Sequence, residues 1–166
     1  MLGKYENFPL NVQFLKILSS TLNSKQLQQK LIKILKDLNR KPLHFEEISI
    51  PTIPNSEIIF EFGIAEGNYF NFLDEQETNR VLSIIKVRQT SLDFFCVVRY
   101  YRCNTQKKDA LKFDYYLFKV NFAVNTVEFR VFHKQGPRYI APEELVALIV
   151  ESINKAVGRC VLDEDL

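Results

Sequence analysis

The sequence has little of the material from which most catalytic and metal-binding sites are built. Its 166 residues include two histidines, three cysteines, five glycines and no tryptophan. No Walker loop, GxGxxG turn, HExxH helix or GxSxG turn occurs, and five glycines provide little for a phosphate-binding loop. The sequence therefore predicts no catalytic motif, no cofactor and no bound metal, although an unrecognised activity stays open.

The three cysteines, Cys96, Cys103 and Cys160, form no CxxC pair and have no pair of histidines near them. This pattern predicts neither a disulfide framework nor a zinc site, and it favours a reducing compartment, either cytoplasmic or nuclear. Cys96 lies in the apolar run 94–98, so we expect a small buried core residue rather than a reactive thiol.

Long apolar runs are also missing. No apolar stretch approaches the roughly 18 residues of a transmembrane helix, and the first residues lack the basic start and apolar stretch of a signal peptide. We therefore expect a protein that is neither exported nor bound to a membrane.

The two histidines and the acidic clusters are weak candidates for chemistry. His44 and His133 each lie in a strand-like run, where a structural or surface histidine is expected more often than a general base. Glu46 and Glu47 are adjacent, so on a strand they would point to opposite faces, and the acidic run 163–165 is expected to be solvated. An enzyme would need a pocket that joins a histidine to a carboxylate, which spacing alone does not show.

The composition predicts one ordinary globular domain. Hydrophobic residues make up 46% of the chain, with 14 Phe and 7 Tyr, which is enough for one packed core. The predicted domain covers residues 1–158, and residues 159–166 form an acidic tail.

Apolar periodicity predicts two helices in the first third of the chain. Val12, Leu15, Leu18 and Leu22 recur at three-to-four spacing. A second series follows Ser24, which is a candidate N-cap, and consists of Leu27, Leu31, Ile34, Leu35 and Leu38.

Strands and two further helices are predicted beyond Pro42. Runs 43–50 and 58–64, joined by the proline-bearing turn 51–55, indicate a hairpin, and runs 92–102, 111–122 and 126–134 indicate a three-stranded meander. Asp74 and Glu77 have the spacing of a capping box for a helix that ends near Lys86. Pro142 suits the first turn of a last helix, and Gly158 suits its end.

The predicted fold class is α+β, an antiparallel sheet of a hairpin plus a meander, covered by N-terminal and C-terminal helices. The order of helices, hairpin, helix, meander and helix resembles that of RWD-type interaction domains and of the small chaperones of bacterial secretion systems. This resemblance is one of element order, without a shared motif.

The distribution of charge is uneven. From Lys86 to Arg138 eleven basic residues face four acidic ones, a net charge of +7, whereas the rest of the chain has eleven basic and sixteen acidic residues, a net charge of −5. Twelve aromatic residues are interleaved with the basic ones between Phe94 and Tyr139. On an open sheet face, such a mixture would let bases stack on rings while cations hold phosphates.

Strand alternation divides residues 126–134 into two faces. Val127, Phe129, Val131 and His133 would be buried, and Glu128, Arg130, Phe132 and Lys134 would be exposed. The alternative, which we favour about two to one, is that the rings pack under helices and the cations form an ordinary solvated face. The candidate contact residues for nucleic acid or a partner are Arg99, Tyr101, Arg102, Lys119, Arg130, Phe132, Lys134, Arg138 and Tyr139.

Three classes of function follow, in decreasing order of preference. The first is a non-catalytic interaction domain, a small subunit or adaptor of an intracellular multiprotein assembly, because the predicted amphipathic helices offer more apolar surface than one sheet face needs. Those helix faces would bind a protein partner or a second copy of the chain. The second class is a single-stranded nucleic-acid binder, RNA or DNA, and the third an enzyme of unrecognised type.

Overall fold

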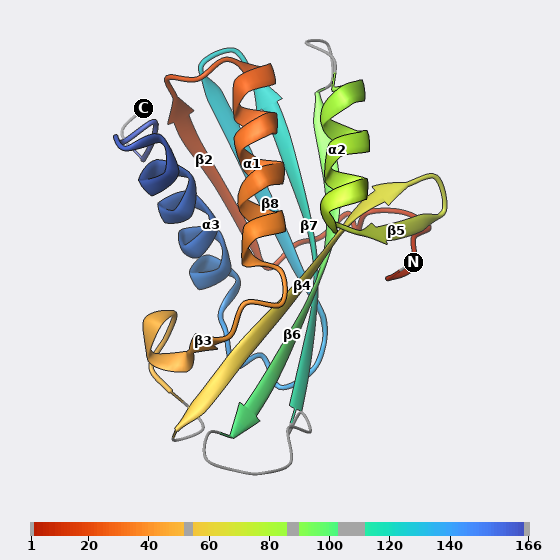
Figure 1. The fold of residues 1–166 in the computed structure, drawn as a ribbon, viewed down its shortest axis with the longest axis vertical. Coiled ribbons are helices and arrows are strands. Elements are labelled where there is room, and N and C mark those ends of the chain that lie inside the picture. Colours follow the sequence, from red (N-terminus) through yellow and green to blue (C-terminus); the bar gives the residue numbers. More distant parts are fainter. Residues whose placement is uncertain (1, 52–54, 86–89, 103–111, 165–166) are drawn as a thin grey trace.

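The computed structural model describes residues 2–51, 55–85, 90–102 and 112–164. The described residues form three α-helices and one antiparallel sheet of nine strands, which confirms the α+β class (Figure 1). In sheet order the strands are β1 (Gly3–Lys4), β5 (Tyr69–Phe72), β4 (Ser56–Glu66), β6 (Ser91–Arg102), β7 (Lys112–Ala123), β8 (Thr126–Gln135), β2 (Phe14–Ser20) and β9 (Leu162–Asp163), while β3 (Leu43–His44) pairs with β4.

The helices α1 (Ser24–Leu38), α2 (Glu75–Ile84) and α3 (Pro142–Val157) lie on the same side of the sheet (Figure 1). We call this side the helix-covered face and the other side the open face. The main core lies between helices and sheet, where rings such as Phe60, Phe94 and Phe118 are at most 1% exposed. Burial on this scale is the dominant stabilising contribution in a domain of this size.

The meander and the last two helices confirm the expectations from sequence. Strands β6, β7 and β8 pair consecutively and antiparallel. The carboxylate of Asp74 accepts the backbone N–H of Glu77 and caps α2, and α3 ends at Gly158, whose φ of +84° a glycine adopts without strain. The expected helix end at Lys86 and the strand start at Leu111 lie outside the described residues.

The first predicted helix is wrong. Phe14–Ser20 is strand β2, paired antiparallel with β8, and the helix that follows is capped by Asn23 instead of Ser24. The sequence FLKILSS fits a strand as well as a helix, since Phe14 and Leu18 point to the helix-covered face while Leu15 and Ile17 point to the open face. Pairing with the edge of β8 decides between them, because it satisfies backbone groups that would otherwise be unpaired.

The predicted hairpin is correct in pairing but too long in its first strand. Only Leu43–His44 pairs with β4, and a 3₁₀ turn at Phe45–Glu47 follows. Phe45 is 1% exposed, and its ring centroid lies 5.6 Å from that of Tyr100. The strand therefore ends where the chain turns at this buried ring.

Three short strands were not expected. β1 and β5 extend the sheet beyond β4, and β9 adds to β2 near the end of the chain. Val161 and Leu162 are at most 2% exposed, so this part of the expected tail is anchored in the core.

Candidate functional site

The open face carries charged, polar and apolar rows that run across the strands. In one row Asp93, Lys119 and Arg130 are register partners on β6, β7 and β8. Lys119 Nζ lies 2.8 Å from Asp93 Oδ1 and Arg130 Nε 2.9 Å from Glu128 Oε1, as close ion contacts whose angles are not those of hydrogen bonds. On the neighbouring strand pair, Arg99 pairs with Glu61. The cations of this face are therefore largely neutralised within the chain.

The next row of the open face is apolar and is covered by the start of the chain. Phe95, Leu117 and Phe132 are register partners, and Leu2, Tyr5 and Phe8 pack against them and their neighbours. The Tyr5 hydroxyl donates a hydrogen bond to the Asp93 carboxylate. Burial, followed by this hydrogen bond, raises the pKa of Tyr5 above its ordinary value.

A cavity of about 420 Å³ lies where the start of the chain meets this row. Its walls include the candidates Phe132 and Lys134, with Lys4, Tyr5 and Leu117. Lys134 and Lys4 are exposed, whereas Phe132 is half-buried. The cavity thus combines apolar walls with two cations and one carboxylate, that of Glu6.

The nine candidates do not form one surface. Strand alternation places Arg99, Tyr101, Lys119, Arg130 and Phe132 on the open face, and Lys134 lies beside Phe132 on the same side. Arg102 follows Tyr101 on β6, so alternation directs its side chain away from the open face. Arg138 and Tyr139 lie in the segment between β8 and α3, where the ring of Tyr139 packs edge-on against Tyr100 at 5.2 Å.

A buried carboxylate that the sequence did not single out organises this segment. Asp114 is 0% exposed and accepts hydrogen bonds from the Tyr100 hydroxyl at 2.5 Å and from the backbone N–H groups of Arg138 at 2.7 Å and Tyr139 at 3.1 Å. His133 Nε2 lies 2.8 Å from Asp114 Oδ1. The only sequence signal was an acidic residue inside an apolar strand, which requires partners if it is buried.

The structure thus joins His133 to a carboxylate, which is one part of the arrangement that the enzyme hypothesis requires. Here the carboxylate oxygens are occupied by contacts that hold the chain between β8 and α3. Burial, followed by the hydrogen bond to Asp114, raises the pKa of Tyr100 above its ordinary value. Burial followed by the charge of Asp114 does the same for Tyr116, whose hydroxyl donates to the carbonyl of Ile140. This cluster is built as an anchor for the start of α3.

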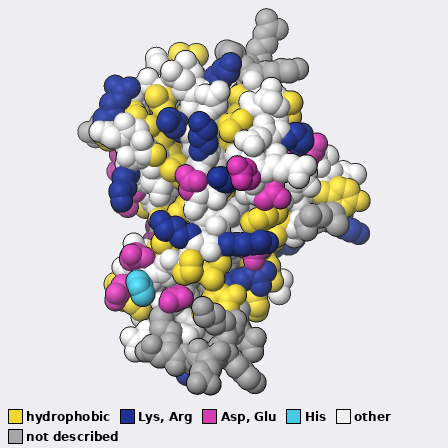
Figure 2. Space-filling model, viewed as in Figure 1, with side chains coloured by type: hydrophobic (Ala, Val, Ile, Leu, Met, Phe, Trp, Pro, Cys, Tyr) yellow, Lys and Arg dark blue, Asp and Glu magenta, His cyan; other side chains and the backbone are white. Residues whose placement is uncertain are grey.

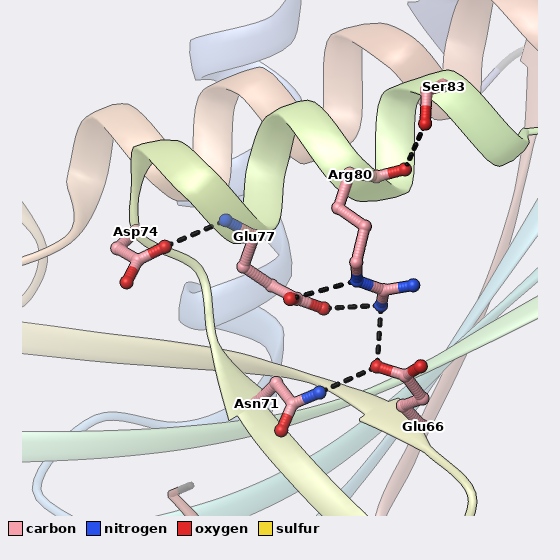
Figure 3. Close-up of polar contacts among 6 residues, drawn as sticks. All are labelled: Glu66, Asn71, Asp74, Glu77, Arg80 and Ser83. Atoms are coloured by element: carbon pink, nitrogen blue, oxygen red, sulfur yellow. Dashed lines mark hydrogen bonds and ion pairs between the residues drawn. The ribbon is translucent and has the colours of Figure 1, made fainter.

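On the helix-covered face, side chains of different kinds are mixed. Figure 2 shows basic side chains interspersed with acidic and hydrophobic ones over the helices. Arg80 of α2 is held by Glu77 on its own helix and by Glu66 on β4, and Asn71 of β5 donates to the same Glu66 (Figure 3). The hydrogen bond to Glu77 is the largest of the effects that raise the pKa of Arg80. This network fastens α2 to the β4–β5 hairpin.

A groove at the edge of the sheet has a largely apolar lining. It is lined by residues of α3, β2 and β9 and has a volume of about 310 Å³, and we call it the edge groove. Its apolar lining is Phe14, Leu18, Val146, Ala147, Val150 and Leu162. Its charged lining is Lys16, Glu143, Glu151, Asp163 and Glu164, and Lys16 is paired with Glu164. The sequence did not reveal this groove, because it depends on β2 being a strand.

On the opposite side of the same strand, Leu15 and Ile17 are each 44% exposed. In the described part of the chain, the outer edge of β2 pairs only at Ser19 and Ser20, which meet β9. An exposed edge with apolar side chains on both sides is a surface that proteins usually cover.

The described residues contain neither a cluster that could hold a metal ion nor a helix that could cross a membrane. In the parts of the chain that the structure describes, no group of three or more His, Cys, Asp or Glu side chains could hold a metal ion. None of the described helices combines the length and the apolar character needed to cross a membrane. Cys96 is fully buried, as expected of a core residue, and burial raises the pKa of its thiol.

No protein-family model, curated protein or solved structure matches this chain.

Proposed function

We propose that this protein is a non-catalytic interaction domain, a small subunit or adaptor that binds another protein through the edge groove. The observation that carries this proposal is the apolar concavity beside the outer edge of β2, which among the described residues is paired only at Ser19 and Ser20. Half-buried apolar residues such as Phe14 and Val150 line it, so an occupant would remove apolar surface from water. At about 25 cal/mol per Å², each 100 Å² of apolar surface removed from water contributes about 2.5 kcal/mol to binding before entropic costs.

The apolar surface that supports this proposal is not the one that the sequence predicted. The surplus apolar surface was expected on two N-terminal helices and the terminal helix, but the first of them is β2, and the apolar faces of α1 and α3 pack in the core. Part of the exposed apolar surface lies instead on the edge strand, at Leu15 and Ile17, and beside it Ala147 and Val150 line the side of α3. Partner binding through helix faces is therefore proposed for α3 together with β2.

Site-specific photo-crosslinking in cells tests the proposal. A photoreactive amino acid at Ala147, inside the edge groove, should give a discrete adduct with a protein, whereas the same group at Gln76, exposed on α2, should not. The variant Val150→Glu should abolish the adduct, because it places a charge on the apolar lining. Ile84→Glu, at a position 54% exposed on α2, is the matched control and should leave it intact. Equal adducts from both positions, or none from either, would contradict the proposal.

A second candidate is single-stranded nucleic-acid binding through the open face. The observation in its favour is the cavity that brings Phe132 next to the exposed Lys134 and Lys4. Against it, Arg99, Lys119 and Arg130 are already in ion pairs. Fluorescence anisotropy with a labelled strand of about 20 nucleotides at two salt concentrations tests this candidate. Salt-sensitive binding that weakens in Phe132→Ala would favour it, and no binding at low salt would exclude it.

A further inference from the structure

The outer edge of β2 has backbone groups that point away from the sheet. Ser20 donates its N–H inward to Asn125 O at 2.9 Å, and Thr21 donates outward to Val161 O at 3.0 Å. Alternate residues of a strand direct their N–H and C=O to the same side, so those of Ser19, Ile17 and Leu15 also point outward. Ser19 pairs with β9, while Leu15 and Ile17 face the edge that no described strand occupies.

The charged side chains that line the edge groove are mostly acidic. Four acidic side chains line the edge groove against the single cation Lys16, which is already paired with Glu164. Glu143 and Glu151 are exposed on α3 and form no ion pair with a described residue. An occupant that carries positive charge would compensate this excess, whereas an acidic one would be repelled.

We infer that the partner of the edge groove presents an extended basic segment that pairs with β2 as an additional strand. This inference rests on the proposed function, because it names the chemistry of a partner for the same groove. An added strand alternates its side chains between the two faces. On the side of α3, long Lys or Arg stems cover Phe14 and Val150 while their charges reach Glu143 and Glu151. On the other side, Val, Ile or Leu pack beside Leu15 and Ile17.

Titration of the full-length ¹⁵N-labelled chain with synthetic peptides tests this inference. The probe is a peptide of roughly seven residues, near the usual strand length, in which Lys alternates with Val, and its matched control alternates Glu with Val. We expect the Lys–Val peptide to shift the amide signals of residues 14–18, with the Glu–Val peptide binding at least about tenfold more weakly, a difference of about 1.4 kcal/mol.

Backbone methylation separates strand pairing from a purely electrostatic contact. Two peptides are N-methylated at alternate residues, one at the odd positions and the other at the even positions. One of them loses the N–H donors that face β2, and the other loses the donors that face solvent. One of these two peptides should therefore lose binding and the other keep it. The double variant E143Q/E151Q should bind the Lys–Val peptide about fivefold more weakly, while thermal unfolding checks that α3 is intact.

The outcomes distinguish the inference from the proposed function. Equal binding of Lys–Val and Glu–Val peptides, equal loss in both methylated peptides, shifts confined to other strands, or no shifts at all would each overturn the inference. A concentration-dependent dimer that E143Q/E151Q leaves unchanged and that broadens the signals of residues 14–18 would also overturn it, because a second copy would then occupy the edge. A crosslinked adduct at Ala147 would still support the proposed function in all of these cases except the dimer. The absence of this adduct would contradict both the inference and the proposed function.

Discussion

The substitution Asp114→Asn should be among the most destabilising isosteric changes in the chain. The Asp114 carboxylate is 0% exposed and accepts from one hydroxyl and two backbone N–H groups, with a fourth contact to His133. An asparagine replaces one acceptor oxygen with a donor, so at least one of these donors loses its partner in a dry environment. Hydrogen bonds to charged groups contribute roughly 1.5–3 kcal/mol each, and an unpaired buried group costs a further 1–3 kcal/mol. We expect a loss of about 3–5 kcal/mol in the free energy of unfolding.

Urea unfolding followed by circular dichroism measures this loss, and Tyr100→Phe provides the comparison. Removing only the hydroxyl takes away one of the four contacts, so we expect a loss of about 1.5–2 kcal/mol. The two changes should not add, because both act on the same hydrogen bond. Amide hydrogen exchange at Arg138 and Tyr139 should accelerate in Asp114→Asn, since both N–H groups are bound to this carboxylate. A loss below about 1 kcal/mol in Asp114→Asn would refute the anchoring role.

Three further predictions concern other contacts. Gly136→Ala should cost at least about 2 kcal/mol, as measured by urea unfolding, because φ is +112° and a Cβ atom would lie 2.2 Å from the carbonyl oxygen of Phe113; full stability would contradict this. Tyr100 and Tyr116 have a pKa above 10.0 when folded, so below pH 10 both states hold the protons, and above it the unfolded state loses them first. The free energy of unfolding should then fall by up to about 1.4 kcal/mol per pH unit for each tyrosine, and absorbance at about 295 nm should show both titrating only on unfolding. Arg80→Ala should cost no more than about 1 kcal/mol in thermal unfolding despite its three hydrogen bonds, because the side chain is 39% exposed; a larger loss would show that the network is worth more than an ordinary surface pair.

Local signals made part of the fold predictable. Asp74 before α2, and Pro142 and Gly158 at the ends of α3, act through backbone groups within a few residues of them, so their effect is visible in sequence. The same is true of β6, β7 and β8, which are rich in aromatic and β-branched residues. Their consecutive pairing requires only that the strands follow one another along the chain.

The candidate site was only partly predictable, because it depends on contacts between residues that are far apart in the chain. The basic and aromatic residues were recognised, but whether Lys119 meets Asp93 or a ligand depends on the register of two strands. Sequence reasoning also missed Asp114, because a lone acidic residue in a strand gives no sign of the four contacts that reach it from three segments. The resemblance in element order likewise gave no information on the open face or on the edge groove.

The sequence by itself determined the class of the fold, the meander with its flanking helices, and the excess of positive charge between Lys86 and Arg138. Those features depend on periodicity, capping and composition, which are local properties of the chain. Only the tertiary structure decided that Phe14–Ser20 is a strand, since that segment fits two periods and the edge of β8 selects one of them. The edge groove follows from that pairing, and the covering of the open face by Leu2, Tyr5 and Phe8 goes with another long-range pairing, that of β1 with β5. These features join residues that are far apart in the chain, and their energies exist only once the sheet has formed.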